Sequence, residues 1–153
     1  MTDVVVLAYE PRHAEAWRTL NEAWINRFFT MEAKDQEVID HPDAKILAKG
    51  GRIFIAELDD QPVGCAALLL LPDGGFELAK MATAEHAQGR GVARAVMTAC
   101  IDAARSLGAP RLYLETNSSL TPAIALYRSV GFVDLPPRES PYVRADVFME
   151  MLL

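Results

Sequence analysis

The segment between residues 76 and 116 constrains the fold most, because it combines a strand pattern, a helix pattern and a second strand pattern in that order. Phe76–Thr83 is a strand candidate. From Gly89 to Leu107 the hydrophobic period becomes helical, with an apolar face formed by Val92, Val96, Ala99, Ala103 and Leu107. Gly108 then ends the helix, and Arg111–Thr116 is the second strand. A crossover of this kind places its two strands side by side, so we expect Phe76–Thr83 and Arg111–Thr116 to be parallel neighbours.

The sequence before this crossover has the pattern of a strand, two helices and an antiparallel meander. Val4–Ala8 is a β-branched run, and Ala14–Phe28 has the periodicity of an amphipathic helix. Met31–His41 predicts a shorter helix that ends before Pro42, since a residue preceding proline avoids helical geometry. Short turn signals separate three successive strand candidates, which are Arg52–Leu58, Pro62–Leu71 and Phe76–Thr83.

The chain after the crossover predicts one more helix and one more strand. Thr121 is a candidate N-cap with Pro122 at the first helical position, and Ala123–Ser129 continues the helix until Gly131 closes it. Ala145–Leu153 predicts the last strand. Because no repeat, low-complexity tract or linker interrupts the pattern, we expect residues 1–153 to form a single mixed α/β domain.

Composition excludes several classes of protein. A length of 153 residues with 51% hydrophobic content suits one buried core, and a net charge of -6 without a basic stripe argues against nucleic-acid binding. The longest apolar run, Cys65–Leu71, is too short to span a bilayer, and the first ten residues lack signal-peptide features. We therefore expect a cytoplasmic protein without a membrane partner. Cys65 and Cys100 are predicted core residues, and no metal site is indicated.

The loop HAQGRGVARAV, from His86 to Val96, suggests an anion site. Small residues before a helix let a bulky anion approach the unpaired N–H groups of its first turn. Gln88 adds a donor and Arg90 a charge, which favours a pyrophosphate over a small solitary anion. The loop matches neither the P-loop nor the dinucleotide-binding pattern. Glycines before a helix also occur for backbone geometry alone, so the loop by itself leaves both interpretations open.

Two blocks of sequence resemble those of the GCN5-related N-acetyltransferases, the GNAT family. Gln88, Gly91 and Ala93 fit the family's Q/R-x-x-G-x-G/A loop. The run AIALYRSVGF fits its second block, A-x-x-L-Y-x-x-x-G-F, through Ala123, Leu126, Tyr127, Gly131 and Phe132. The resemblance covers nearly the whole chain. It implies an α/β (α+β) fold with a central, mixed and mostly antiparallel sheet, splayed at a parallel pair and flanked by helices.

The resemblance implies a binding site for acetyl-CoA as cosubstrate. The loop residues that would hold its pyrophosphate are Gln88, Gly89, Arg90, Gly91, Val92 and Ala93. Backbone groups of Met81 and Thr83, with Ala82 between them, would bind the pantetheine arm, and Ala123 belongs to the second block. Many members carry asparagine where this chain has Leu120. Asn117 is a candidate replacement for that cofactor contact, although the commoner role of such a residue is to cap a turn.

The same resemblance implies catalytic roles. Tyr127 matches the tyrosine that protonates the departing thiolate, whereas an aromatic residue in a helix can also serve packing alone. Glu77 is the first candidate for the base that deprotonates the amine, directly or through water, and an ordinary solvated glutamate is the alternative. Glu115 is the second candidate, either as base or as the group that binds the substrate ammonium. His86 is a weaker candidate for proton relay, and the backbone N–H of Met81 for oxyanion binding.

The expected function is transfer of an acetyl group to a primary amine of a small molecule or amino-acid-like acceptor, by direct attack in a ternary complex. Phe29 and Tyr142 are the preferred candidates for the acceptor pocket over Trp24 and Phe28, which fit a helix core. Three alternatives remain: a non-catalytic acyl-CoA-binding module, acetylation of a protein N-terminus or lysine, and binding of another pyrophosphate ligand. Because members of the family often dimerise, a homodimer is one expected assembly.

Overall fold

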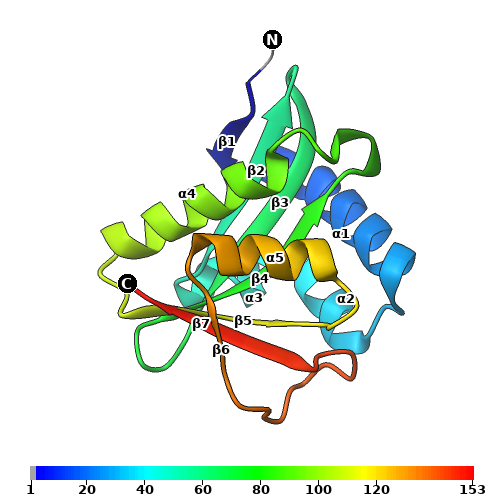
Figure 1. The fold of residues 1–153 in the computed structure, drawn as a ribbon. Helices are drawn as coiled ribbons and strands as arrows, with labels where there is room; N and C mark the ends of the chain where they lie inside the picture. The colour runs from blue at the N-terminus through cyan, green and yellow to red at the C-terminus, as the bar shows by residue number, and fades with distance from the viewer. Residues whose placement is uncertain (1–2) are drawn as a thin grey trace.

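The computed structural model describes residues 3–153, which contain one seven-stranded sheet of order β1-β2-β3-β4-β5-β7-β6 (Figure 1). Neighbouring strands are antiparallel except for β4 and β5, which are parallel. The strands are β1 (Val5–Ala8), β2 (Arg52–Leu58), β3 (Gln61–Leu70), β4 (Phe76–Thr83), β5 (Arg111–Thr116), β6 (Val133–Asp134) and β7 (Val147–Leu152). The predicted mixed, mostly antiparallel sheet and its parallel pair are confirmed.

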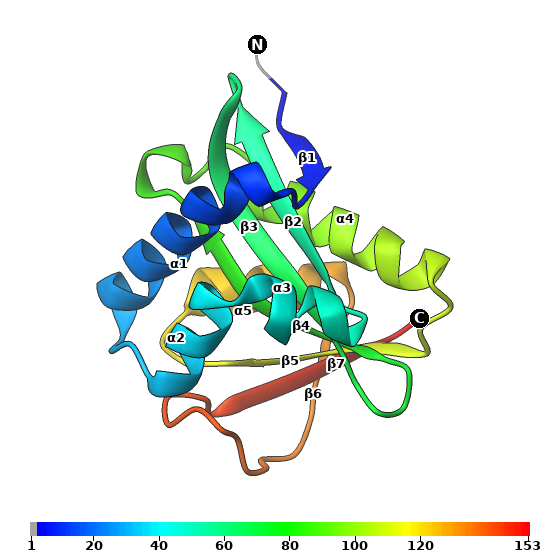
Figure 2. The ribbon, with the colours of Figure 1, turned by 180° about the vertical axis from the view of Figure 1, so that it is seen from behind.

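Helices cover both faces of the sheet. α4 and α5 lie on the face seen in Figure 1, and α1, α2 and α3 on the face seen in Figure 2. The helices are α1 (Ala14–Phe28), α2 (Ala33–Asp40), α3 (Pro42–Lys45), α4 (Val92–Ser106) and α5 (Thr121–Val130). In the described part of the chain no helix is long and apolar enough to cross a membrane.

Each face of the sheet has its own hydrophobic core. Under α4, the buried side chains of Val96, Met97 and Cys100 pack against strand residues such as Leu68 and Leu112. The opposite core contains Trp17 and Leu20 of α1 with Val38, Ile46, Ile53, Ile55, Cys65, Ala67 and Ala82. Cys65 and Cys100 are both buried free thiols, which confirms their prediction as core residues.

The sheet opens between β4 and β5. Their parallel pairing is limited to Phe76 with Leu112 and Glu77 with Tyr113. A β-bulge follows in β4, where Lys80 and Met81 together oppose a single residue of β3 and Lys80 has a positive φ of 54°. Bulges increase local twist and bend a strand, so β4 diverges from β5 beyond this point. The predicted splay of the parallel pair is therefore present.

Several element boundaries differ from the sequence prediction. The crossover helix begins at Val92 rather than Gly89, because Gly89 and Gly91 have φ values of 78° and 80°, which a right-handed helix cannot include. Thr121 is the first residue of α5 and not its N-cap, a position taken by Leu120 without a side-chain hydrogen bond. The short elements α3 and β6 were not predicted, since a few residues give no readable period.

Candidate functional site

Two adjoining cavities occupy the opening between β4 and β5. The larger, about 420 Å³, extends to the start of α4, and the smaller, about 110 Å³, lies between α1, β4, β5 and the segment before β7. Their walls share five residues, which are Trp24, Met81, Leu120, Ala123 and Tyr127. Two ligands bound in these cavities would therefore meet beside Tyr127.

The larger cavity ends at the N-terminus of α4. Gly91 caps this helix without a side-chain hydrogen bond, and the N–H of Ala95 is the first to reach it, at 3.0 Å from the Gly91 carbonyl oxygen. The three N–H groups before Ala95 have no acceptor within the helix, as expected for a helix N-terminus. A Cβ added at Gly89 or Gly91 would meet no atom within 4 Å, so glycine is required here by left-handed backbone geometry and not by crowding.

Most of the predicted cofactor residues surround this larger cavity. Its wall includes Met81, Thr83, Gln88, Gly89, Gly91, Val92, Ala93 and Ala123. Three predicted residues are not in that wall, and one of them, Asn117, lines the smaller cavity instead. Ala82 is buried against Cys65 in the core beneath α1, and Arg90 is exposed on the loop. His86 is also exposed and lines neither cavity.

Tyr127 lies on α5 between the two cavities. Its ring packs edge-on against Phe132, with the ring centroids 6.0 Å apart. Within residues 3–153 we find no hydrogen-bond partner for its hydroxyl group, which is available to a ligand. Burial raises the pKa of Tyr127 to about 12. The phenol is consequently protonated at neutral pH, as a proton donor must be.

Glu77 and Glu115 both line the smaller cavity. Glu77 pairs with Tyr113 across the parallel strands, and Glu115 follows Tyr113 by two residues, so the three side chains share one face of the sheet. Burial, and then the charge of Glu115, raise the pKa of Glu77 to about 7, against the opposing effects of Lys80 and Lys34. Such a carboxylate can exchange a proton at neutral pH.

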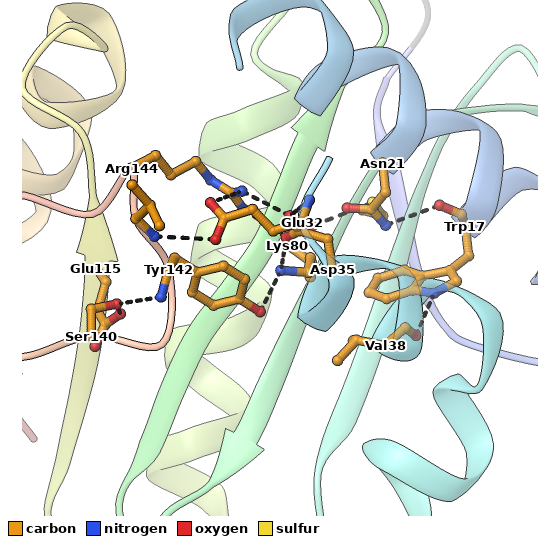
Figure 3. A network of polar contacts seen from close by, with 12 residues as sticks. Trp17, Asn21, Glu32, Asp35, Val38, Lys80, Glu115, Ser140, Tyr142 and Arg144 are labelled. Atoms are coloured by element: carbon orange, nitrogen blue, oxygen red, sulfur yellow. Dashed lines mark hydrogen bonds and ion pairs between the residues drawn. The ribbon is translucent and has the colours of Figure 1, made fainter. Parts of the chain in front are cut away.

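A buried ion network forms one wall of the smaller cavity (Figure 3). Asp35 of α2 accepts hydrogen bonds from the Lys80 Nζ at 2.9 Å and from both terminal nitrogens of Arg144, at 2.6 and 2.7 Å. Burial opposes ionisation of Asp35, but the bonds from Arg144 and Lys80 outweigh it and lower its pKa to about 2. Sequence analysis missed this network because Asp35 and Arg144 are 109 residues apart and belong to no local motif.

The aromatic candidates divide between the cavities. Phe28 lines the larger cavity, Phe29 and Tyr142 line the smaller one, and Trp24 lines both. Tyr142 is fixed by the Lys80 Nζ, which donates a hydrogen bond of 3.0 Å to its hydroxyl oxygen. Phe29 and Tyr142, the two preferred acceptor-site candidates, are thus brought together with Glu77 around one small space.

Asn117 lies in the wall of the smaller cavity and not of the larger one. Its Nδ2 donates to the Arg144 carbonyl oxygen at 2.7 Å, and its Oδ1 accepts from the Ser119 N–H at 2.9 Å. One bond of the side chain therefore holds the turn before α5, and the other ties this turn to the segment before β7.

We predict that Asn117→Ala lowers the free energy of unfolding by about 1 kcal/mol, since two hydrogen bonds are lost. The affinity for acetyl-CoA is expected to stay unchanged. Chemical denaturation and calorimetry measure the two quantities separately. A large loss of acetyl-CoA affinity in a stable variant would instead support a direct cofactor contact.

The fold and the site combine a mixed sheet that opens at a parallel pair, a cavity that ends at a helix N-terminus and a second, smaller cavity beside it. Residues 15–132 match the model of the acetyltransferase (GNAT) family, which is more than half of the chain. The chain therefore belongs to the GNAT family, and the resemblance identified in the sequence is confirmed.

Individual relatives agree with this assignment. An uncharacterized N-acetyltransferase of Escherichia coli, YjgM, is 41% identical over 86 residues, which is 54% of this chain and 52% of that protein. The chain spans only 27% to 54% of the length of the curated relatives it matches.

Solved structures share the fold. A GNAT acetyltransferase of Staphylococcus aureus superposes with a TM-score of 0.87 at 16% identity, covering 98% of this chain and 99% of the other. The ribosomal-protein-S18-alanine N-acetyltransferase of Escherichia coli gives 0.78 at 20% identity, covering 98% and 94%.

Proposed function

We propose that the protein is an N-acetyltransferase that moves the acetyl group of acetyl-CoA to a primary amine of a small acceptor, by direct attack in a ternary complex. The observation that carries this proposal is the position of Tyr127, between a large cavity that ends at a helix N-terminus and a small cavity that contains Glu77. Membership of the GNAT family supports the transfer of an acetyl group.

The larger cavity fits the cosubstrate. Its free N–H groups and the positive end of the α4 dipole suit a pyrophosphate, and the glycines leave its approach open. Beyond Glu77, β4 has no ladder partner on the side of β5, so backbone groups near Met81 can bind an amide-containing arm. When bound, acetyl-CoA supplies an activated thioester at the junction of the cavities.

Two side chains of the protein transfer the protons of the reaction. Glu77, with its raised pKa, accepts a proton from the amine in the smaller cavity, directly or through water. Tyr127 donates its phenolic proton to the departing thiolate sulfur. The N–H of Met81 is the proposed donor to the oxygen of the reacting carbonyl. Each group acts from a fixed position on a strand or helix, which keeps the geometry defined.

The size of the smaller cavity favours a small acceptor. A space of about 110 Å³ walled by Trp24, Phe29 and Tyr142 admits an amine with a short substituent. An acceptor that is part of a protein, as the name of the structurally similar Escherichia coli enzyme states for that enzyme, is the second candidate. The third candidate function is that of a non-catalytic acyl-CoA-binding module. It would not explain the position of Tyr127 or the raised pKa of Glu77.

The proposal is tested first by calorimetry with acetyl-CoA and with CoA, followed by thiol release in the presence of a panel of small amines. We expect micromolar binding and thiol release that depends on the amine. Tight binding without turnover for any amine or peptide would favour the non-catalytic module. Absence of binding would refute the proposal.

A pair of glycine variants tests the anion site on α4. Gly91 and Gly108 flank the two ends of this helix, both have a positive φ, and both have open space where a Cβ would lie. We expect Gly91→Ala and Gly108→Ala to lose similar stability, about 1–2 kcal/mol, from left-handed strain. Only Gly91→Ala is expected to weaken acetyl-CoA binding, by about 10-fold or 1.4 kcal/mol. Equal affinities for both variants would argue against a phosphate site at this loop.

A further inference from the structure

Four charged side chains line the smaller cavity, and their surroundings differ. They are Glu77, Lys80, Glu115 and Arg144. The charge that an incoming molecule experiences depends on which of these groups already have a partner of opposite charge. Their contacts within residues 3–153 therefore indicate what kind of acceptor the cavity attracts.

The two cationic side chains of the cavity, Lys80 and Arg144, are already paired with carboxylates. Lys80 and Arg144 both bind the carboxylate of Asp35, which is fully buried. Arg144 also donates to the Glu32 carboxylate, with Nη1 and Oε2 3.1 Å apart. Two positive charges are thus matched by two negative charges in one network, on the side of α2 (Figure 3). This wall presents little net charge to a ligand.

Glu115 is held differently. One oxygen of its carboxylate accepts a hydrogen bond from the Tyr113 hydroxyl at 2.9 Å, and the other accepts one from the Ser140 hydroxyl at 2.5 Å. Neutral hydroxyl groups orient a carboxylate but do not cancel its charge. No cation of the described residues forms a salt bridge with Glu115 or with Glu77. The charged side chains of the cavity that lack a salt-bridge partner are consequently both carboxylates, on the side of β4 and β5.

We propose that the acceptor is a cationic amine without a carboxylate next to the amine, and that Glu115 binds its ammonium group beside Glu77. An α-amino acid would bring its own carboxylate into this cavity. The cations there are already paired with Asp35 and Glu32, and the charged groups without a salt bridge are themselves carboxylates, which disfavour a third one. Glu115 thus serves recognition, while Glu77 accepts the proton. This inference rests on the proposed acetyl transfer.

The first experiment compares acceptors that differ only in the carboxylate. Phenylalanine, phenylalaninamide and phenethylamine form one such series, and leucine, leucinamide and 3-methylbutylamine form another. Thiol release gives kcat/KM for each at one pH. We expect the amines and amides to exceed the free amino acids by about 10-fold or more, since like charges disfavour the wrong ligand strongly. Free amino acids that match or exceed their amines would overturn the inference, while leaving acetyl transfer established.

Two variants connect this preference to the named residues. Glu115→Gln keeps the shape of the side chain and one acceptor oxygen, turns the other oxygen into an NH2 donor that a hydroxyl oxygen can accept from, and removes the charge, so KM for the preferred amine should rise about 10-fold with acetyl-CoA affinity unchanged. Glu32→Gln keeps an oxygen at the N-cap of α2 but releases part of the charge of Arg144, so the discrimination against free amino acids should become smaller.

The control is Asp134→Asn, which breaks the exposed pair with Arg128 outside both cavities. It is expected to leave KM and the acceptor preference as in the native protein. If Glu115→Gln changed neither the amine KM nor the preference, Glu115 would have no role in recognition. A loss of acetyl-CoA binding throughout would instead count against the proposed function itself.

Discussion

Replacing Tyr127 with phenylalanine is expected to lower kcat by about 10²-fold to 10⁴-fold, the range typical of a lost general acid. The affinity for acetyl-CoA is expected to stay the same. The ring of Tyr127 packs against Phe132, and phenylalanine preserves this contact. The hydroxyl has no partner among the described residues, so its removal leaves no buried group unsatisfied. The change therefore isolates the proton donor.

Steady-state kinetics and calorimetry together measure this effect. Tyr9→Phe is the matched control, because it removes a phenolic hydroxyl from a residue that lines neither cavity. Its kcat should equal that of the native protein. Equal rates for Tyr127→Phe and the native protein would exclude the general-acid role, whereas reduced acetyl-CoA binding would indicate a packing role in the cavity wall.

Replacing Glu77 with glutamine is expected to lower kcat/KM by about 10²-fold. It should also remove the acidic limb of the pH profile, which is the rise in activity between acidic and neutral pH. A base acts only when deprotonated, and the pKa of Glu77 is about 7. Activity of the native protein should therefore increase as the pH rises through about 7 and lose that dependence above it. The glutamine variant has no such group, so this acidic limb should disappear.

The pH profile also tests the environment of Glu77. Burial and Glu115 raise its pKa, and Lys80 and Lys34 act in the opposite direction. Glu115→Gln should consequently move the acidic limb to lower pH. Glu150→Gln, on β7 and outside both cavities, is the control that should leave the profile unchanged. An acidic limb that persisted in Glu77→Gln would assign the base to another group.

The part of the site proposed to bind acetyl-CoA has the clearest local signal in the sequence. The loop around Gly91, the start of α4 and the position of Tyr127 on α5 follow from contiguous patterns, each within about a dozen residues. Such patterns report local backbone geometry, which depends on neighbouring residues. The parallel pair of β4 and β5 was predictable for the same reason, because a right-handed crossover constrains it.

Other parts of the structure have no local signal. The bulge at Lys80 places a non-glycine residue at a positive φ, which propensity alone disfavours. Met81 and Ala82 are adjacent in sequence, yet one lines the cavities and the other enters the core beneath α1. Only the pairing of β4 with β3 decides which side chain faces which way.

The sequence by itself determined the family, the order of the elements, the glycine-rich loop proposed to bind an anion and the tyrosine that lies at the junction of the two cavities. The tertiary structure alone decided which charged groups of the smaller cavity are paired. Asp35 lies on α2, Lys80 on β4 and Arg144 in the turn before β7, and the three pair only because folding brings these segments together. Glu115 has no salt-bridge partner among the described residues, and its hydrogen-bond donors are the hydroxyl groups of Tyr113 and Ser140. Electrostatic balance depends on distances between segments remote in sequence, and those distances exist only after folding.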